Sequence, residues 1–151
     1  MWQQGGQQGG QGIINQGTYF GSHNGHLTDF TQNNNLSLVA VRGRHGALVD
    51  QIQFLFIDIN THQYVESPAC GGSGGSEFMF QAPPGQWINK IMIRVGACID
   101  AIQFRTNQGV TSPSFGGNGG GPGEYETHGR ITGFKARSEN CLNGLCMIVS
   151  E

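Results

Sequence analysis

Two aspartates, Asp50 and Asp100, stand at the same place in two copies of one short motif. Residues 46–54 (GALVDQIQF) and residues 96–104 (GACIDAIQF) agree in six of nine positions, at an offset of fifty residues. In each copy a glycine precedes the aspartate by four residues. An ionised aspartate accepts hydrogen bonds from two hydroxyl groups at once, and such charge-assisted bonds are about twice as strong as neutral ones. The motif therefore suits the recognition of paired hydroxyl groups.

A second element, a large residue followed by a glycine-rich loop, recurs three times. The copies are residues 20–25 (FGSHNG), 70–75 (CGGSGG) and 115–120 (FGGNGG). A weaker third copy of the aspartate motif, residues 139–147 (ENCLNGLCM), has glutamate and asparagine in place of the glycine and the aspartate. Paired glycines remove the side chains that would keep a ligand away from backbone N–H donors. Each of three units thus owns one glycine loop and one aspartate-type loop.

The elements that must position these loops are predicted to be strands. Short apolar alternations separated by glycine clusters are typical of strands, and no segment has a helical stripe of useful length. Glycine inside a helix costs roughly 1 kcal/mol, which also favours an all-β fold. Strands are expected at residues 36–41, 52–57, 78–80, 88–93, 102–104 and 145–149. Because no single unit can cover its own apolar face, we expect three small sheets around a pseudo-threefold axis.

Composition indicates one domain and excludes two classes of partner. The chain has 151 residues with 36% hydrophobic and 12% charged residues, and 26 glycines. Residues 1–17 are rich in Gln and Gly, so we expect a flexible arm before a domain at residues 18–151. The net charge of −2 offers no basic field, so no nucleic-acid partner is expected. No apolar run approaches the roughly 18 to 20 residues of a membrane span, so no membrane insertion is expected.

Cysteine and histidine spacing leaves disulfide pairing open and gives no metal site. The four cysteines are compatible with two disulfides in three connectivities, or with none: Cys70, Cys98, Cys141 and Cys146. Their even number favours a secreted, extracellular protein, and residues 1–5 lack the features of a signal peptide, so any signal would have been removed. The cysteines at 141 and 146 have no second pair at zinc-site spacing, and His23-x-x-His26 is more typical of solvated histidines. We expect no metal and no cofactor.

Four stretches carry a resemblance to a known family. They are residues 71–75 (GGSGG) after the Asp50 strand, residues 102–107 (IQFRTN), residues 113–120 (PSFGGNGG) and residues 130–138 (RITGFKARS). In this order they resemble the jacalin-related lectins, whose fold is β-prism I, with three Greek-key sheets and pseudo-threefold symmetry. The resemblance runs from about residue 18 to the C-terminus. It implies that a G-x-x-x-D loop and a glycine loop of one sheet together bind one monosaccharide, without metal.

The resemblance places two such sites in this chain. In the family, the carboxylate takes the O4 and O6 hydroxyls. N–H groups of the two residues after the loop glycine, and one glycine-loop N–H, complete the bonds. Gly46 and Gly96 would let each loop turn so that the following N–H groups point outward. The expected residues of site one are Gly46, Ala47, Leu48, Asp50, Gly71 and Gly72, and those of site two are Gly96, Ala97, Cys98, Asp100, Gly116 and Gly117.

The third unit departs from this pattern and is expected to bind weakly or not at all. Its residues would be Gly21, Ser22, Asn140, Cys141 and Asn143. An amide at position 143 keeps one acceptor but loses the charge and the second carboxylate oxygen, which costs on the order of 1 to 3 kcal/mol. Galactose-preferring relatives use a free amino-terminal glycine in the site, whereas here an arm of about twenty residues precedes the first glycine loop. The resemblance therefore favours mannose or glucose.

The function expected from the sequence is a lectin that binds mannose- or glucose-type glycans and is not an enzyme. Single-sugar affinity should be weak, so we expect a homo-oligomer that gains strength from several sites. One alternative is a structural or matrix protein that self-assembles through its amide-rich arm and has reduced sugar binding. Another is a sugar-targeting domain of a larger protein. Asp50 and Asp100 are also compatible with merely capping their own turns, and His45 is a candidate for the rim of site one.

Overall fold

The computed structural model describes residues 14–150, and these residues form strands, turns and loops without any helix. The first sheet has the strand order β6-β5-β4-β8, and β7 also pairs with β5. Its strands are β4 (Leu36–His45), β5 (Val49–Asp58), β6 (Tyr64–Glu66), β7 (Cys70–Gly71) and β8 (Ser76–Gln81). The second sheet has the order β11-β10-β9-β12. Its strands are β9 (Ile88–Val95), β10 (Ile99–Thr106), β11 (Phe115–Gly116) and β12 (Gly121–Glu126).

The third sheet is built from both ends of the chain. It has the order β1-β14-β13-β3, and β2 also pairs with β14. Its strands are β1 (Ile14–Gln16), β2 (Phe20–Gly21), β3 (His26–Phe30), β13 (Arg130–Ser138) and β14 (Leu142–Ser150). In all three sheets a long hairpin carries a third strand that follows a glycine loop. In the first two sheets the chain returns to pair beside the first strand of the hairpin, which is Greek-key topology.

Alternating side chains from the three sheets meet in one core. Phe54 of β5, Phe104 of β10 and Phe134 of β13 are almost fully buried. The rings of Phe54 and Phe134 have centroids 4.8 Å apart, so the first and third sheets are in direct aromatic contact. Burial of these apolar faces, which no sheet could achieve alone, holds the three sheets together.

The prediction of an all-β fold with three sheets is confirmed, and all six expected strands lie within observed strands. The sequence analysis did not predict β13, which lies between β14 and β3, and it did not predict the edge strands β3 and β12 or the short strands β1, β2, β6, β7 and β11. The segment of β12, GPGEYE, contains glycine, proline and two glutamates, so it has no strand-like pattern of its own. It becomes a strand because β9 supplies a continuous ladder from Val95 to Lys90.

The end of the expected arm is part of the third sheet. Ile14, Asn15 and Gln16 pair with β14, and the Gly17 N–H donates to the Met147 carbonyl at 2.7 Å. The rest of the predicted flexible arm, residues 1–13, lies outside the described residues.

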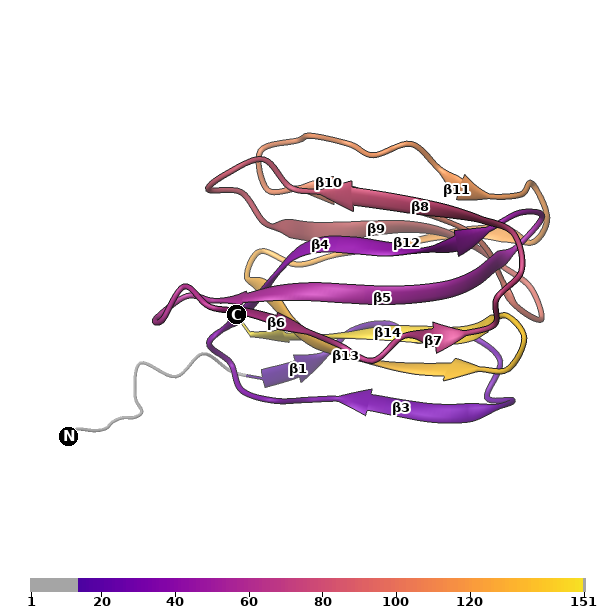
Figure 1. The fold of residues 1–151 in the computed structure, drawn as a ribbon, viewed down its shortest axis with the longest axis horizontal. Coiled ribbons are helices and arrows are strands. Elements are labelled where there is room, and N and C mark those ends of the chain that lie inside the picture. The colour runs from indigo at the N-terminus through magenta and orange to yellow at the C-terminus, as the bar shows by residue number, and fades with distance from the viewer. Residues whose placement is uncertain (1–13, 151) are drawn as a thin grey trace.

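The three long hairpins turn at the same end of the molecule. In Figure 1 the glycine loops that follow β7 and β11, and the one that precedes β3, lie at the right-hand end, and β14 ends at the left beside β1. All aspartate-type loops and glycine loops are therefore gathered on one end. Within residues 14–150 there is no helix that could span a membrane and no group of three His, Cys, Asp or Glu side chains arranged to hold a metal ion.

Candidate functional site

The aspartate-type loops of the first two sheets are tight turns with outward backbone donors. In loop one, between β4 and β5, the Gly46 N–H donates to the Leu48 carbonyl at 2.9 Å. The N–H groups of Ala47 and Leu48 have no acceptor among the described residues. Loop two, between β9 and β10, repeats this geometry, since the Gly96 N–H donates to the Cys98 carbonyl at 2.9 Å. Two free donors therefore stand beside each aspartate.

The carboxylates of Asp50 and Asp100 lie against the glycine loops of their own sheets. A Cβ atom added to Gly74 would be 3.2 Å from Asp50 Oδ1, and one added to Gly75 would be 2.7 Å from Asp50 Oδ2. A Cβ atom added to Gly119 would clash with Asp100 Oδ2. Both aspartates are half-buried, and neither carboxylate has a hydrogen bond or an ion pair with another residue in 14–150. Each carboxylate is an acceptor without a partner in this part of the chain, so no hydrogen bond supports the interpretation of Asp50 and Asp100 as caps of their own turns.

The two glycines that begin each glycine loop have structural tasks. Gly71 and Gly116 have φ of 119° and 122°, which side-chain-bearing residues rarely adopt. The N–H groups of Gly72 and Gly117 donate to the carbonyls of Asp50 and Asp100 at 2.8 and 2.9 Å. These N–H groups, which the resemblance assigned to sugar, thus fasten each glycine loop to the strand that carries the aspartate.

Gly46 and Gly96 do not have positive φ. The expectation that their conformational freedom makes the turn is therefore wrong, because an ordinary backbone conformation suffices there. Glu139 stands at the same place in the third loop, where its N–H donates to the Cys141 carbonyl at 3.0 Å. A side chain at this position is compatible with the turn.

Arginines that the sequence reading missed hold the glycine loops in place. Arg94 donates from Nε to the Gly119 carbonyl at 2.9 Å and from Nη2 to the Gly120 carbonyl at 2.7 Å. Arg44 makes the same pair of bonds to Gly74 and Gly75, at 3.1 and 2.7 Å. The planar guanidinium fork suits two adjacent carbonyls. It fixes the part of the glycine loop against which the carboxylate lies.

The signal for these arginines was present in the sequence. Arg44, Arg94 and Arg137 each stand two residues before the first residue of an aspartate-type loop. In the third sheet the contact is reduced to one bond, from Arg137 Nη1 to the Gly25 carbonyl at 3.2 Å. The motif of the first two units is therefore better written R-x-G-x-x-x-D.

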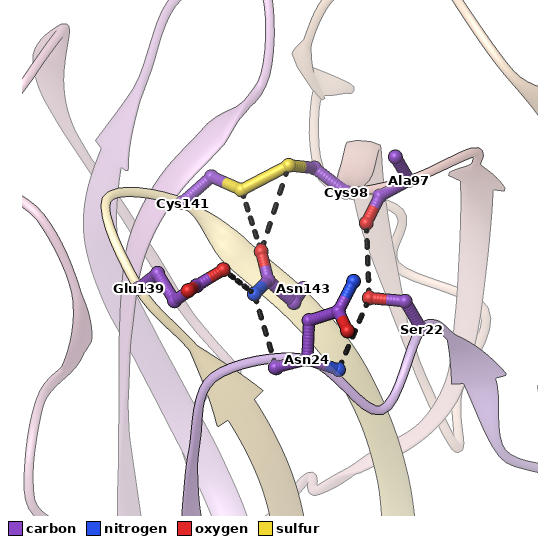
Figure 2. Close-up of a disulfide and its surroundings, with 7 residues drawn as sticks. All are labelled: Ser22, Asn24, Ala97, Cys98, Glu139, Cys141 and Asn143. Carbon is purple, nitrogen blue, oxygen red and sulfur yellow. Dashed lines mark hydrogen bonds between the residues drawn. A yellow bond between two sulfur atoms is a disulfide. The ribbon is translucent and has the colours of Figure 1, made fainter.

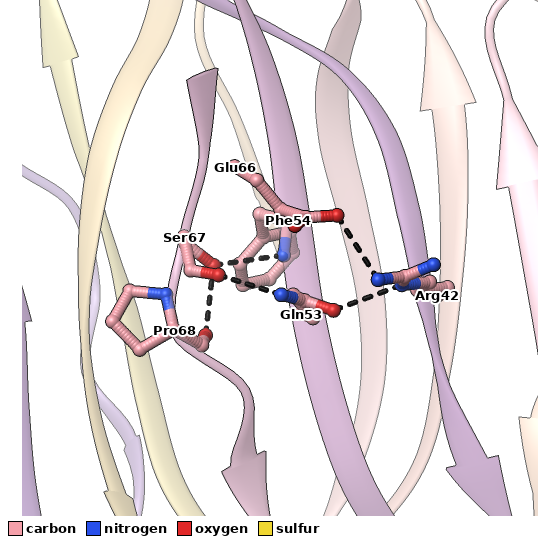
Figure 3. Close-up of polar contacts among 6 residues, drawn as sticks. All are labelled: Arg42, Gln53, Phe54, Glu66, Ser67 and Pro68. Carbon is pink, nitrogen blue, oxygen red and sulfur yellow. Dashed lines mark hydrogen bonds and ion pairs between the residues drawn. The ribbon is translucent and has the colours of Figure 1, made fainter. Parts of the chain in front are cut away.

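A repeated serine-proline pair anchors the chain that leads into each of the first two glycine loops. Figure 3 shows the first pair: Ser67 Oγ accepts from the Phe54 N–H at 3.0 Å, and Gln53 Nε2 donates to the Ser67 carbonyl at 2.8 Å. In the second sheet Ser112 takes the place of Ser67, with Gln103 and Phe104 as its partners at 2.8 and 2.9 Å. These bonds fix the segment three residues before each glycine loop.

Each glycine loop also touches the aspartate-type loop of a neighbouring sheet. A Cβ atom on Gly72 would lie 2.5 Å from the Asn140 carbonyl oxygen, and one on Gly117 would clash with the Ala47 carbonyl oxygen. In the third unit Ser22 occupies this place and its hydroxyl donates to the Ala97 carbonyl at 3.2 Å. The six loops thus form a closed ring around the pseudo-threefold axis.

The third unit is closed by its own side chains (Figure 2). Asn143 is only 3% exposed, and its Nδ2 donates to the Asn24 carbonyl at 3.0 Å and to Glu139 Oε1 at 2.8 Å. Its Oδ1 lies 2.8 Å from Cys141 Sγ. Asn143 therefore has no free group comparable with the carboxylates of Asp50 and Asp100.

One disulfide joins two aspartate-type loops. Cys98 of loop two is bonded to Cys141 of the third loop, so no free thiol stands in site two. Cys70 and Cys146 are free and buried, and burial raises the pKa of both thiols. The spacing of the cysteines did not select this pairing, because it depends on the third sheet lying beside the second.

His45 lies beneath the loops. Its ring makes edge contacts with Phe78 and Phe115, at centroid distances of 5.5 and 5.6 Å, and its Nδ1 accepts from the Gly116 N–H at 2.9 Å. The side chain links loop one to the glycine loop of site two.

Comparison with known proteins agrees with this architecture. Residues 17–148 match the jacalin-like lectin domain. The chain belongs to that family. Its fold is β-prism I, as the sequence predicted, because solved jacalin-related lectins superpose on it closely. No curated protein sequence matches the chain.

Three solved structures illustrate the likeness, all at low identity. A mannose-binding jacalin-related lectin from Ananas comosus has 21% identity and a TM-score of 0.78, over 91% of this chain and 97% of that one. The artocarpin–mannotriose complex has 15% identity and a TM-score of 0.80, over 95% and 100%. A Malaysian banana lectin has 20% identity and a TM-score of 0.75, over 91% and 97%. At these identities the likeness shows the fold.

Proposed function

We propose that this jacalin-like lectin domain binds mannose- or glucose-type glycans at two sites and catalyses no reaction on them. Site one is formed by loop one and the glycine loop 70–75, and site two by loop two and the glycine loop 115–120. Two of the structural neighbours are described as a mannose-binding lectin and as a complex with mannotriose, which supports this class of ligand. Self-association and secretion stay predictions from the sequence.

The observation that carries the proposal is the free carboxylate beside two free N–H groups, present twice. A hexose presents neighbouring hydroxyls that both donate and accept, so it needs acceptors and donors side by side. Asp50 with the N–H groups of Ala47 and Leu48 offers this combination, and the equivalent atoms of loop two offer it again. Asn143 does not, because its amide is already bonded, so the third unit is proposed to be silent.

Binding without catalysis fits the placement of the carboxylates. A glycosidase needs two carboxyl groups across one glycosidic bond, roughly 5 to 9.5 Å apart. Asp50 and Asp100 belong to different sheets, and each lies over its own glycine loop. Each therefore serves a separate sugar.

The test is an NMR titration of methyl α-mannoside and methyl α-glucoside into the wild type, Asp50→Asn, Asp100→Asn and the double variant. Replacing the carboxylate by an amide should weaken the site concerned by about 1 to 3 kcal/mol, or roughly 5- to 150-fold in Kd. The double variant should not reach saturation at the sugar concentrations that saturate the wild type. Because neither carboxylate has a hydrogen-bond or ion-pair partner, the free energy of unfolding of these variants should differ from that of the wild type by less than about 0.5 kcal/mol.

Glu126→Gln is the matched control, since Glu126 is exposed at the opposite end of β12 and its side chain has no hydrogen bond or ion pair within residues 14–150. It should bind sugar as the wild type does. Undiminished sugar binding in the Asp50/Asp100 double variant would refute the proposal.

A further inference from the structure

A cleft of about 440 Å³ lies where the three aspartate-type loops meet. This volume is within the range of about 300 to 1,000 Å³ typical of ligand pockets. Asp50 lines the cleft on one side, whereas Asp100 does not line it. Site one therefore opens into a second space, across the pseudo-threefold axis.

Part of the cleft lining is apolar. Leu48, Cys98 and Cys141 are each the third residue of their loop, so they occupy equivalent places around the axis. Cys98 and Cys141 are joined by the disulfide, which Figure 2 shows directly above Asn143. An apolar lining of this kind, held by a disulfide, suits the C–H face of a sugar ring, because such contact removes apolar surface from water.

The far rim of the cleft carries polar groups from the third unit. Asn24, Glu139 and Asn140 are exposed and line the cleft. The side-chain amides of Asn24 and Asn140 have no hydrogen-bond partner within residues 14–150, and Glu139 uses one carboxylate oxygen to accept from Asn143. Two amides and one carboxylate oxygen are therefore available to hydroxyl groups.

The charge of the lining selects among sugars. Asp50 and Glu139 both carry negative charge, and no lysine or arginine lines the cleft. A sugar acid would place its carboxylate near two others without a cation to balance it, which disfavours it.

We infer that the third unit serves as an extension of site one and that the cleft binds the second residue of a neutral oligosaccharide. This inference rests on the proposed function, because the first residue is held at Asp50. Site one is then a site for at least a disaccharide, whereas site two takes a single terminal sugar. The unit that has lost its own carboxylate contributes amides and the disulfide to its neighbour.

The experiment compares methyl α-mannoside with α-linked mannobioses of each linkage, in the full chain carrying Asp100→Asn so that site one alone binds. The best mannobiose should bind about tenfold more tightly than the monosaccharide. Asn140→Ala and Asn24→Ala should each reduce that gain and leave the Kd of methyl α-mannoside unchanged. Asn60→Ala, an exposed amide in the turn after β5 at the opposite end, should change neither value. In the Asp50→Asn chain, where only site two binds, no gain is expected.

The outcomes separate the two proposals. If methyl α-mannoside binds to the Asp100→Asn chain but no mannobiose gains affinity, the extended site is wrong and the proposed function stands. A gain that survives both asparagine substitutions also contradicts the cleft as its source. If methyl α-mannoside does not bind to any chain with an intact aspartate, the proposed function fails first. A disaccharide whose second residue is a uronic acid should bind no more tightly than the monosaccharide. If it gained as much affinity as the best mannobiose, the inference that the cleft binds a neutral sugar would be wrong.

Discussion

Replacement of Arg94 tests whether the glycine loop must be held in place for site two to bind sugar. The side chain makes two bonds to adjacent carbonyls, of Gly119 at 2.9 Å and of Gly120 at 2.7 Å. Arg94 is a better choice than Arg44, because Arg44 also has an ion pair with Glu77 at 3.5 Å, whose loss would complicate the result.

The expected effect follows from these two bonds. At a partly exposed position each bond contributes about 1 kcal/mol. Arg94→Gln should therefore lower the free energy that favours the ordered loop over the open loop by about 2 kcal/mol. If the loop binds sugar only when it is held, the apparent Kd of site two should rise by up to about 30-fold. Arg94→Lys keeps the charge and one bond and should show a smaller loss.

The assay is a titration of methyl α-mannoside into chains that also carry Asp50→Asn, so that only site two responds. Amide hydrogen exchange in residues 117–120 reports loop opening directly and should become faster in Arg94→Gln. Arg105→Gln is the control, since Arg105 is exposed and its side chain makes no hydrogen bond or ion pair within residues 14–150. An unchanged Kd in Arg94→Gln together with faster exchange would refute the reasoning, because it would show that loop order does not matter for binding.

Three further results are expected. Gly119→Ala should displace the Asp100 carboxylate and abolish sugar binding at site two in a titration. Gly121→Ala is the control and should bind normally, because nothing lies within 4 Å of the added Cβ. Equal sugar binding by the two variants would contradict the contact between Gly119 and Asp100. Removing the Cys98–Cys141 disulfide, whose cysteines are 43 residues apart, should lower the free energy of unfolding by about 2 to 4 kcal/mol in urea melts. The same urea midpoint with and without reductant would contradict this expectation. The two free thiols have pKa values raised by burial, so their contribution to stability is complete below the ordinary thiol pKa of about 8.5 and is lost as pH rises through the higher folded value. Urea melts from pH 7 to 10 should show this decline, and native protein should not react with a thiol reagent at pH 8.

Much of this fold can be predicted from local patterns in the sequence. The alternation at residues 52, 54 and 56 places Ile52, Phe54 and Phe56 on one face of β5, and all three are buried. The repeat at an offset of fifty predicted that two sheets would carry equivalent loops, and the structure brings each aspartate against the glycine loop of its own sheet. Both results depend only on strand periodicity and on glycine clusters, which can be read without knowing the partners of a strand.

Other features depend on which segments become neighbours. The third sheet joins residues 14–30 to residues 130–150, and Arg137 reaches the Gly25 carbonyl across 112 positions of sequence. A weak or silent third unit was expected from the loss of one carboxylate, but the hydrogen bonds of the Asn143 amide also require Asn24 and Glu139 to lie beside it. The sequence shows that position 143 lacks a carboxylate, but it does not show which neighbouring groups bond the amide that replaces it.

The sequence by itself determined the all-β class, the three units and the positions of the two aspartates, because hydrophobic alternation and glycine placement act within a few residues. Only the tertiary structure decided that Cys98 pairs with Cys141, that arginines hold the glycine loops, and that Asp50 but not Asp100 opens into a cleft. These depend on the packing of three sheets around one axis. The two-residue alternation of a strand determines which of its side chains face inward, but it carries no information about which loops meet at the end of the prism.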